Sequence, residues 1–77
     1  MLKIDDAITY ATDHGCKVSD DFIRKGTRLK AFYVMDGIIQ VMITQCHKGA
    51  RRYRVNGEEH SRAQAIISAV NYLKQYG

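Results

Sequence analysis

The segment from Leu29 to Thr44, LKAFYVMDGIIQVMIT, constrains this chain most, because it consists of two apolar runs joined by Asp36-Gly37. An Asp-Gly pair between alternating apolar residues favours a β-hairpin, since its two-residue turn needs positive φ and gives the two strands matching twist. A turn centred on Asp36 and Gly37 predicts four cross-strand pairs: Met35 with Ile38, Val34 with Ile39, Phe32 with Val41, and Lys30 with Ile43. We therefore expect an antiparallel hairpin at the centre of the fold.

Side chains alternate between the two faces of a strand, so the predicted hairpin has one apolar face and one mixed face. The apolar face carries Phe32, Val34, Ile39, Val41 and Ile43. The mixed face carries Ala31, Tyr33, Met35, Ile38, Gln40, Met42 and Thr44. We expect the first face to form the core and the second to be available to a partner.

Helical spacing of apolar residues occurs near both ends of the chain. Near the start, the spacing predicts a helix over 4–14, with Gly15 as its C-terminal cap. Near the end, Ser61-Arg62-Ala63-Gln64 matches a capping box, which predicts that the last helix begins there. Its apolar stripe consists of Ala63, Ile66, Ile67, Val70 and Leu73, extended by Ala65, Ala69, Tyr72 and Tyr76. We expect this stripe to cover the apolar face of the hairpin.

Arg51-Arg52-Tyr53-Arg54-Val55 alternates as a third strand, with Tyr53 and Val55 toward the core. Asn56-Gly57 is a second turn signal, and Glu58-Glu59-His60 is expected to add a very short edge segment. Residues 16–28 leave two alternatives open. One is a short helix at 20–25, and the other is a short strand through Phe22 and Ile23.

Together these elements predict an α+β fold: a three-stranded antiparallel β-meander packed on one face by an N-terminal helix and a C-terminal helix, in the order α-β-β-β-α. The 77 residues make one small domain, 1–77. A chain of this size buries only roughly 60% of the surface that its unfolded form exposes. No apolar run is long enough to cross a bilayer and the start lacks a signal peptide's apolar region, so we expect no membrane partner and a cytoplasmic location.

This order of elements, ending in a basic strand and the helix start SRAQA, resembles the architecture of double-stranded-RNA-binding domains, whose sheet also backs onto two helices. The likeness is one of architecture. The lysine-rich helix start with which those domains grip phosphates is represented here by Arg62 alone. No residue role is therefore carried over from it.

Candidate metal and catalytic residues are sparse. His14, Cys16, Cys46 and His47 offer nitrogen and sulfur donors, but their spacing does not match a zinc knuckle, so we expect no metal and no bound zinc on purification. The acidic pairs at 5–6, 20–21 and 58–59 are explained as helix starts or a turn. The chain has no glycine-rich phosphate loop and no nucleophile elbow. We therefore expect a protein that is not an enzyme, with no cofactor and no small-molecule substrate.

The charge is unevenly distributed. Residues 1–22 carry −3 and residues 23–77 carry +7, which together give the net +4. Such asymmetry favours an anionic partner. Arginine and glutamine can bond base edges or phosphates and tyrosine can stack on a base, so the sequence predicts nucleic-acid binding through the mixed sheet face. The candidate binding residues are Tyr33, Gln40, Met42, Arg52, Arg54, Lys48, Arg51 and Arg28.

A second function class fits the same face. Ala31, Met35, Ile38 and Met42 make it more apolar than a free surface requires, and Tyr, Met and Arg are enriched at protein interfaces. The alternative prediction is therefore a protein-interaction module, either a small inhibitor or adaptor or a homodimer. Salt dependence separates the two classes, because phosphate binding weakens steeply with salt whereas apolar docking hardly changes.

Overall fold

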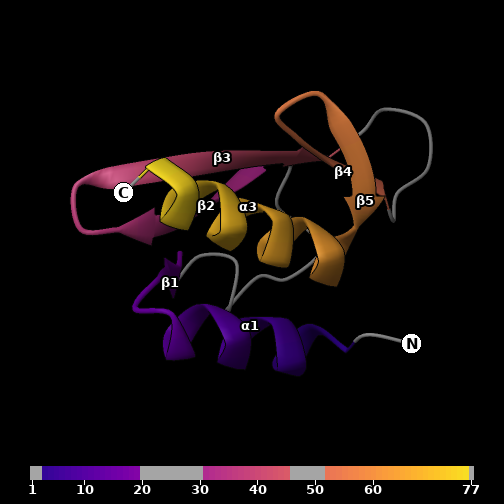
Figure 1. Ribbon diagram of the computed structural model, residues 1–77. Coiled ribbons are helices and arrows are strands. Elements are labelled where there is room, and N and C mark those ends of the chain that lie inside the picture. Colours follow the sequence, from indigo (N-terminus) through magenta and orange to yellow (C-terminus); the bar gives the residue numbers. More distant parts are fainter. Residues whose placement is uncertain (1–2, 20–30, 46–51, 77) are drawn as a thin grey trace.

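The computed structural model describes residues 3–19, 31–45 and 52–76 (Figure 1). In chain order the elements are α1 (Ile4–Asp13), β1 (Lys17–Val18), β2 (Ala31–Asp36), β3 (Ile39–Gln45), β4 (Arg52–Val55), β5 (Glu58–Ser61) and α3 (Arg62–Tyr76). The strands form one antiparallel sheet in the order β1-β2-β3-β4-β5, which confirms the predicted α+β class. The sheet has five strands, not the three of the predicted meander. Strand β5 is the predicted edge segment, whereas β1 was not predicted. The alternatives for 20–25 lie outside the described residues.

Helix α1 ends as its sequence predicts. Gly15 has a φ of 76°, which is the left-handed conformation that a glycine adopts without a Cβ penalty. Its amide donates to the Thr12 carbonyl (3.0 Å), and the Cys16 amide donates to the Ala11 carbonyl (2.8 Å). These two bonds form a Schellman motif, and burial of both Ala11 and Cys16 supplies its apolar contact. The motif turns the chain directly into β1.

The register of the central hairpin differs from the prediction. Asp36 is paired with Ile39, so Gly37 and Ile38, rather than Asp36 and Gly37, are the two residues of the turn. The remaining pairs include Val34 with Val41 and Phe32 with Ile43, not the predicted ones. Gly37 alone has positive φ, 65°, which is the pattern of a type II′ turn. Because the displacement is two residues, the side chains of β2 and β3 keep their predicted faces, whereas Ile38, which was predicted on the mixed face, lies in the turn.

The second hairpin follows its dipeptide signal. Val55 is paired with Glu58, so Asn56 and Gly57 are the two turn residues. Both have positive φ, 53° and 84°, as a type I′ turn requires. The prediction that Tyr53 and Val55 face the core is confirmed, since each is 1% exposed.

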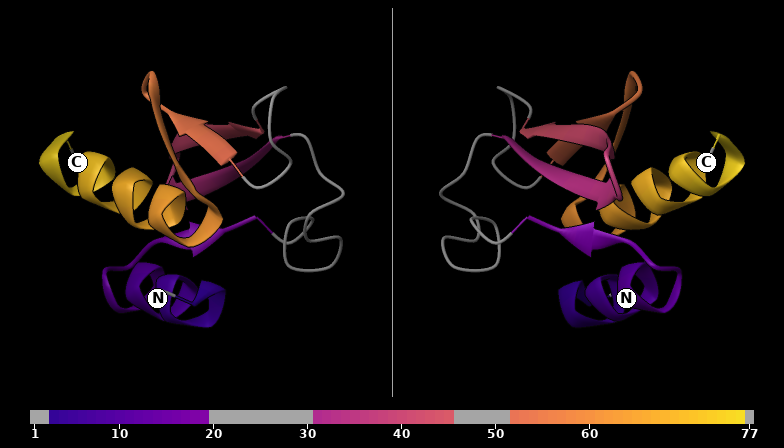
Figure 2. Two further views of the ribbon diagram at one scale, coloured as in Figure 1. Left: turned by 90° about the vertical axis from the view of Figure 1, so that its right-hand side faces the viewer. Right: turned by 90° about the vertical axis from the view of Figure 1, so that its left-hand side faces the viewer.

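The core lies between the sheet and α3 (Figures 1 and 2). Helix α3 contacts strands β2 to β5. Helix α1 packs against α3 and against the edge strand β1. The predicted core residues that are buried include Phe32, Val34, Val41, Ile43, Ala63, Ile66, Val70 and Leu73. Ile39 was expected in this core but is 48% exposed, because the corrected register places it at the turn end of β3, opposite Asp36. Tyr72 was expected to extend the helix stripe but is 39% exposed.

The start of α3 is capped by the predicted serine. The Gln64 amide donates to Ser61 Oγ at 3.3 Å, the N3-to-cap bond of a capping box. Ser61 is also the last residue of β5, so the helix begins directly at the sheet edge. Neither of the two described helices has the length and apolar character that crossing a bilayer requires.

Candidate functional site

One face of the sheet carries no helix among the described elements, and we call it the open face (Figure 2). Strand pairing and alternation place eleven described residues on it: Lys17, Ala31, Tyr33, Met35, Gln40, Met42, Thr44, Arg52, Arg54, Glu59 and Ser61. Tyr33 and Met42 are directly opposite each other and are 37% and 51% exposed. The open face therefore combines a central aromatic-thioether pair with a basic region on β4.

The structure brings together five of the eight predicted site residues. Tyr33, Gln40, Met42, Arg52 and Arg54 share the open face, and all five side chains are exposed, as predicted. Lys48, Arg51 and Arg28 lie outside the described residues. The cations that were expected to flank the face as phosphate contacts are therefore not part of the described site.

Glu59 changes the electrostatics of the basic region. It is paired with Arg54 across the β4–β5 hairpin, and its carboxylate lies 4.0 Å from Arg52 Nε and 3.9 Å from an Arg54 guanidinium nitrogen. All three side chains are about half exposed, so these ion pairs contribute little to stability. Their effect is local: an anion that approaches the two arginines also meets a carboxylate.

The second feature of the site is an open edge of β3. Strand β4 is in register only with Thr44 and Gln45, so among the described residues no strand is paired with 39–43 on that side. In a two-residue hairpin the pair closing the turn, here Asp36 and Ile39, exchanges backbone hydrogen bonds, and such pairs then alternate along the strands. The backbone N–H and C=O groups of Gln40 and Met42 therefore point away from β2. We call the segment 39–43, on this side, the β3 edge.

Apolar side chains flank the β3 edge on both faces of the sheet. Met42 lies on the open face and Ile39 lies on the helix side, and each is about half exposed. Ile38, in the turn at the end of the edge, is fully exposed. No charged residue occurs in 38–45. An uncharged edge strand with exposed apolar neighbours is a template for pairing with another strand.

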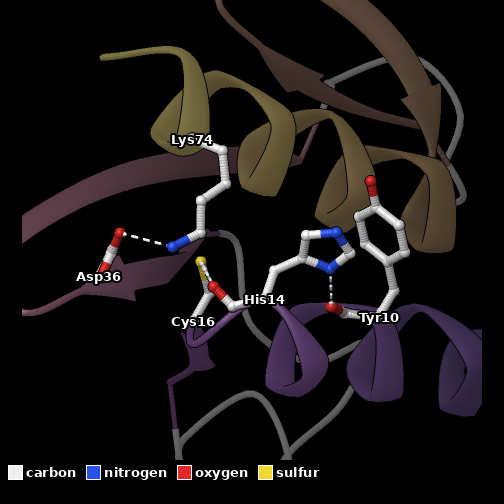
Figure 3. A network of polar contacts seen from close by, with 5 residues as sticks. All are labelled: Tyr10, His14, Cys16, Asp36 and Lys74. Carbon is white, nitrogen blue, oxygen red and sulfur yellow. Dashed lines mark hydrogen bonds and ion pairs between the residues drawn. The ribbon is translucent and has the colours of Figure 1, made fainter. Parts of the chain in front are cut away.

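A separate polar cluster joins the ends of α1, β2 and α3 (Figure 3). Lys74 Nζ lies 3.1 Å from Asp36 Oδ2, and the Cys16 thiol lies beside this ion pair. Burial raises the pKa of the Cys16 thiol; the Lys74 ammonium lowers it and the Asp36 carboxylate raises it by smaller amounts. The thiol therefore stays protonated at neutral pH, unlike an activated nucleophile.

His14 in this cluster has a structural role. Its Nδ1–H donates to the Tyr10 carbonyl at 2.8 Å, and its ring lies 4.2 Å from the Tyr10 ring (Figure 3). The Tyr10 hydroxyl in turn donates to Asn71 Oδ1 at 2.6 Å, which connects α1 to α3. The cluster as a whole fastens the two helices and the first hairpin together.

No group of three or more histidine, cysteine or acidic side chains is close enough to hold a metal within the part of the chain that the structure describes. Cys46 and His47 fall outside that part. The absence of bound zinc therefore stays a prediction for elemental analysis.

Comparison with known proteins adds no family to this description. No family model, no curated protein and no solved structure matches the chain.

Two features of the site were missed from the sequence, and a signal existed for one of them. The Asn56-Gly57 turn implies that Arg54 faces Glu59, so the carboxylate between the arginines follows from the hairpin register alone. The β3 edge had no such signal, because it depends on where β4 leaves β3. That point is set by the whole sheet.

Proposed function

We propose that this chain is a small, non-enzymatic binding module that docks on a protein partner through the open face and the β3 edge. The observation that carries the proposal is the β3 edge, a five-residue stretch without a paired strand in the described structure and with exposed apolar side chains on both faces. Strand addition suits such an edge, because backbone bonds supply affinity and alternate side chains supply specificity.

The side chains of the open face agree with a protein partner. Tyr33 and Met42 form a paired, exposed center, and tyrosine, methionine and arginine are the residue types enriched at protein interfaces. Arg52 and Arg54 then lie toward the rim, where charged groups steer a partner and fix its orientation. The module needs no catalytic group, and the protonated Cys16 thiol supplies none.

Titration with an extended peptide tests this function. The probe is a blocked octapeptide of alternating threonine and valine with a glutamate at each end, added to isotopically labelled protein and followed by NMR. We expect the largest amide shifts at Gln40 and Met42, whose N–H groups point toward the added strand. An absence of shifts on the β3 edge at saturating peptide would contradict the proposal.

Two variants at Gln40 provide a matched control. Gln40→Pro removes an outward N–H that β2 does not use, so it should abolish the peptide-induced shifts. Gln40→Ala keeps that N–H and should retain them. Equal binding by the two variants would mean that the peptide does not add to β3.

Nucleic acid is the second candidate, and the specific observation that favours it is the pair of exposed arginines on the open face. Duplex binding should then weaken steeply with salt, and Arg52→Glu with Arg54→Glu should abolish it. Glu59→Gln is a more specific test, because removing the carboxylate beside the arginines should tighten phosphate binding several-fold. A duplex affinity unchanged by Glu59→Gln would count against this candidate.

A further inference from the structure

We infer that the partner of the β3 edge is a second copy of this chain, which pairs its own β3 edge antiparallel to the first about a two-fold axis at Val41. This inference rests on the proposed function, because it names the partner of the same edge. Three properties of the edge support it: its hydrogen-bonding groups are symmetric about Val41, the chain leaves the edge at both ends, and the edge carries no charge.

The hydrogen-bonding groups of the edge are self-complementary. The unpaired segment, 39–43, has Val41 at its center, and the outward-pointing groups of Gln40 and Met42 lie on either side of it. An antiparallel copy with its two-fold axis at Val41 sets Gln40 opposite the partner's Met42, and Met42 opposite the partner's Gln40. Both outward residues of each chain then form hydrogen-bonded pairs.

The two ends of the edge also match each other. At one end the Gly37-Ile38 turn leads the chain toward β2, away from the edge, and at the other end β4 begins its pairing at Thr44. In the antiparallel dimer, each copy's strand turns away where the other copy's β4 begins. The fully exposed Ile38 comes to this junction, so the dimer would cover a side chain that the single chain leaves in solvent.

The side chains beside the seam are apolar or neutral in this register. On the helix side, the half-exposed Ile39 lies beside the seam, opposite the partner's Ile43, whose side chain is buried in its own core. On the open face, Met42 lies opposite the partner's Gln40. Residues 38–45 carry no charge, so two chains that each carry +4 can meet there without like charges in contact.

The contact is short for a stable interface. A standard interface buries about 1,600 Å² in total, and a five-residue strand pair with a few flanking side chains gives less. We therefore expect a reversible dimer with a dissociation constant of about 10–100 μM. It should depend little on salt, since no ion pair crosses the seam.

Sedimentation equilibrium over a wide concentration range tests the dimer. The wild type should shift from monomer to dimer, and Gln40→Lys with Met42→Lys should raise the dissociation constant at least about tenfold, because each ammonium group faces a like charge across the seam. Both side chains are exposed, and circular dichroism checks that the fold is retained. Thr9→Lys with Gln75→Lys adds the same charge at exposed positions on the helices and should leave the dimer unchanged.

A charge-complementary variant tests the register. In Gln40→Lys with Met42→Glu, the two-fold axis at Val41 sets each ammonium opposite a carboxylate, so the dimer should return to at least wild-type strength. A two-fold axis at any other residue would not bring position 40 opposite position 42. Failure of this variant to dimerise, or dimerisation of the double-lysine variant at wild-type strength, would overturn the inference.

The outcomes separate this inference from the proposed function. A wild type that stays monomeric at millimolar concentration but shows peptide shifts on the β3 edge would overturn the homodimer and leave the binding module standing. A wild type that stays monomeric and shows no peptide shifts would overturn both. A dimer disrupted by Gln40→Lys with Met42→Lys, with the helix control unaffected, supports both.

Discussion

The two hairpins of this protein look alike in sequence and differ in structure. Each contains a glycine after an acidic or amide residue, yet β2–β3 turns at Gly37-Ile38 whereas β4–β5 turns at Asn56-Gly57. The first is a type II′ turn with one positive φ, and the second is a type I′ turn with two. The dipeptide signal therefore locates a turn to within one residue, and other contacts decide which residue lies at its center.

Asp36 shows what those contacts are. As the last residue of β2 it lies on the helix side of the sheet, where its carboxylate binds Lys74 of α3. Asn56 has no such partner among the described residues and adopts a φ of 53°, which asparagine tolerates well. The hairpins differ in charge too: β2–β3 presents an uncharged edge, and β4–β5 presents arginines beside a carboxylate.

The largest expected effect comes from removing the contact between the hairpins. Phe32 of β2 and Tyr53 of β4 pack edge to face, with ring centroids 5.9 Å apart and both side chains buried. Phe32→Ala should lower the free energy of unfolding by about 3–5 kcal/mol, measured by urea denaturation. Tyr33→Ala, the neighbour on the open face, should cost about 1 kcal/mol or less. Similar losses of unfolding free energy for Phe32→Ala and Tyr33→Ala would mean that the two residues do not lie on a buried and an exposed face of the sheet.

The two turn types predict different responses to asparagine. Asparagine is tolerated in the left-handed region of a type I′ turn, whereas the first center of a type II′ turn is accessible mainly to glycine. Gly37→Asn should therefore cost about 1–3 kcal/mol and Gly57→Asn clearly less. No atom lies within 4 Å of a Cβ added at either glycine, so the difference measures backbone conformation. Equal losses in thermal unfolding would argue that both turns are of one type.

The junction of the second hairpin with α3 depends on Ser61. Ser61→Ala removes the oxygen that accepts from the Gln64 amide, and should cost on the order of 1 kcal/mol. In a domain this small the melting temperature should fall by several degrees. Ser61→Asp keeps an acceptor and serves as the control. An unchanged melting curve for Ser61→Ala would mean that the cap does not stabilise the helix.

The smallest expected effect concerns the tie between the first hairpin and α3. Lys74→Met removes the ion pair with Asp36, whose partly exposed groups make it worth about 0.2–1 kcal/mol. The loss should shrink at high salt, where the wild-type pair is screened. Lys74→Arg should retain most of the stability. A loss that is independent of salt would indicate packing by the lysine stem instead.

Local chemistry made much of the fold predictable. Gly15 and Ser61 mark the ends of helices through backbone conformation and capping, which act within a few residues. Alternation along each strand assigned side chains to the core or to the open face, and that assignment survived a two-residue error in register because the strand repeat is two. Five of the predicted site residues were found together for the same reason.

The rest was decided by tertiary contacts. Strand β1 is two residues long, too short for a periodic signal, and forms because Lys17 and Val18 pair with β2, with the Ser19 amide donating to the Tyr33 carbonyl. The exposure of Ile39 follows from the register that ends β2 at Asp36. The β3 edge depends on where β4 leaves β3. Sequence alone thus determined which faces the side chains occupy, while the partners of each strand, and the edge left open, required the assembled sheet, because strand pairing joins residues far apart in the chain.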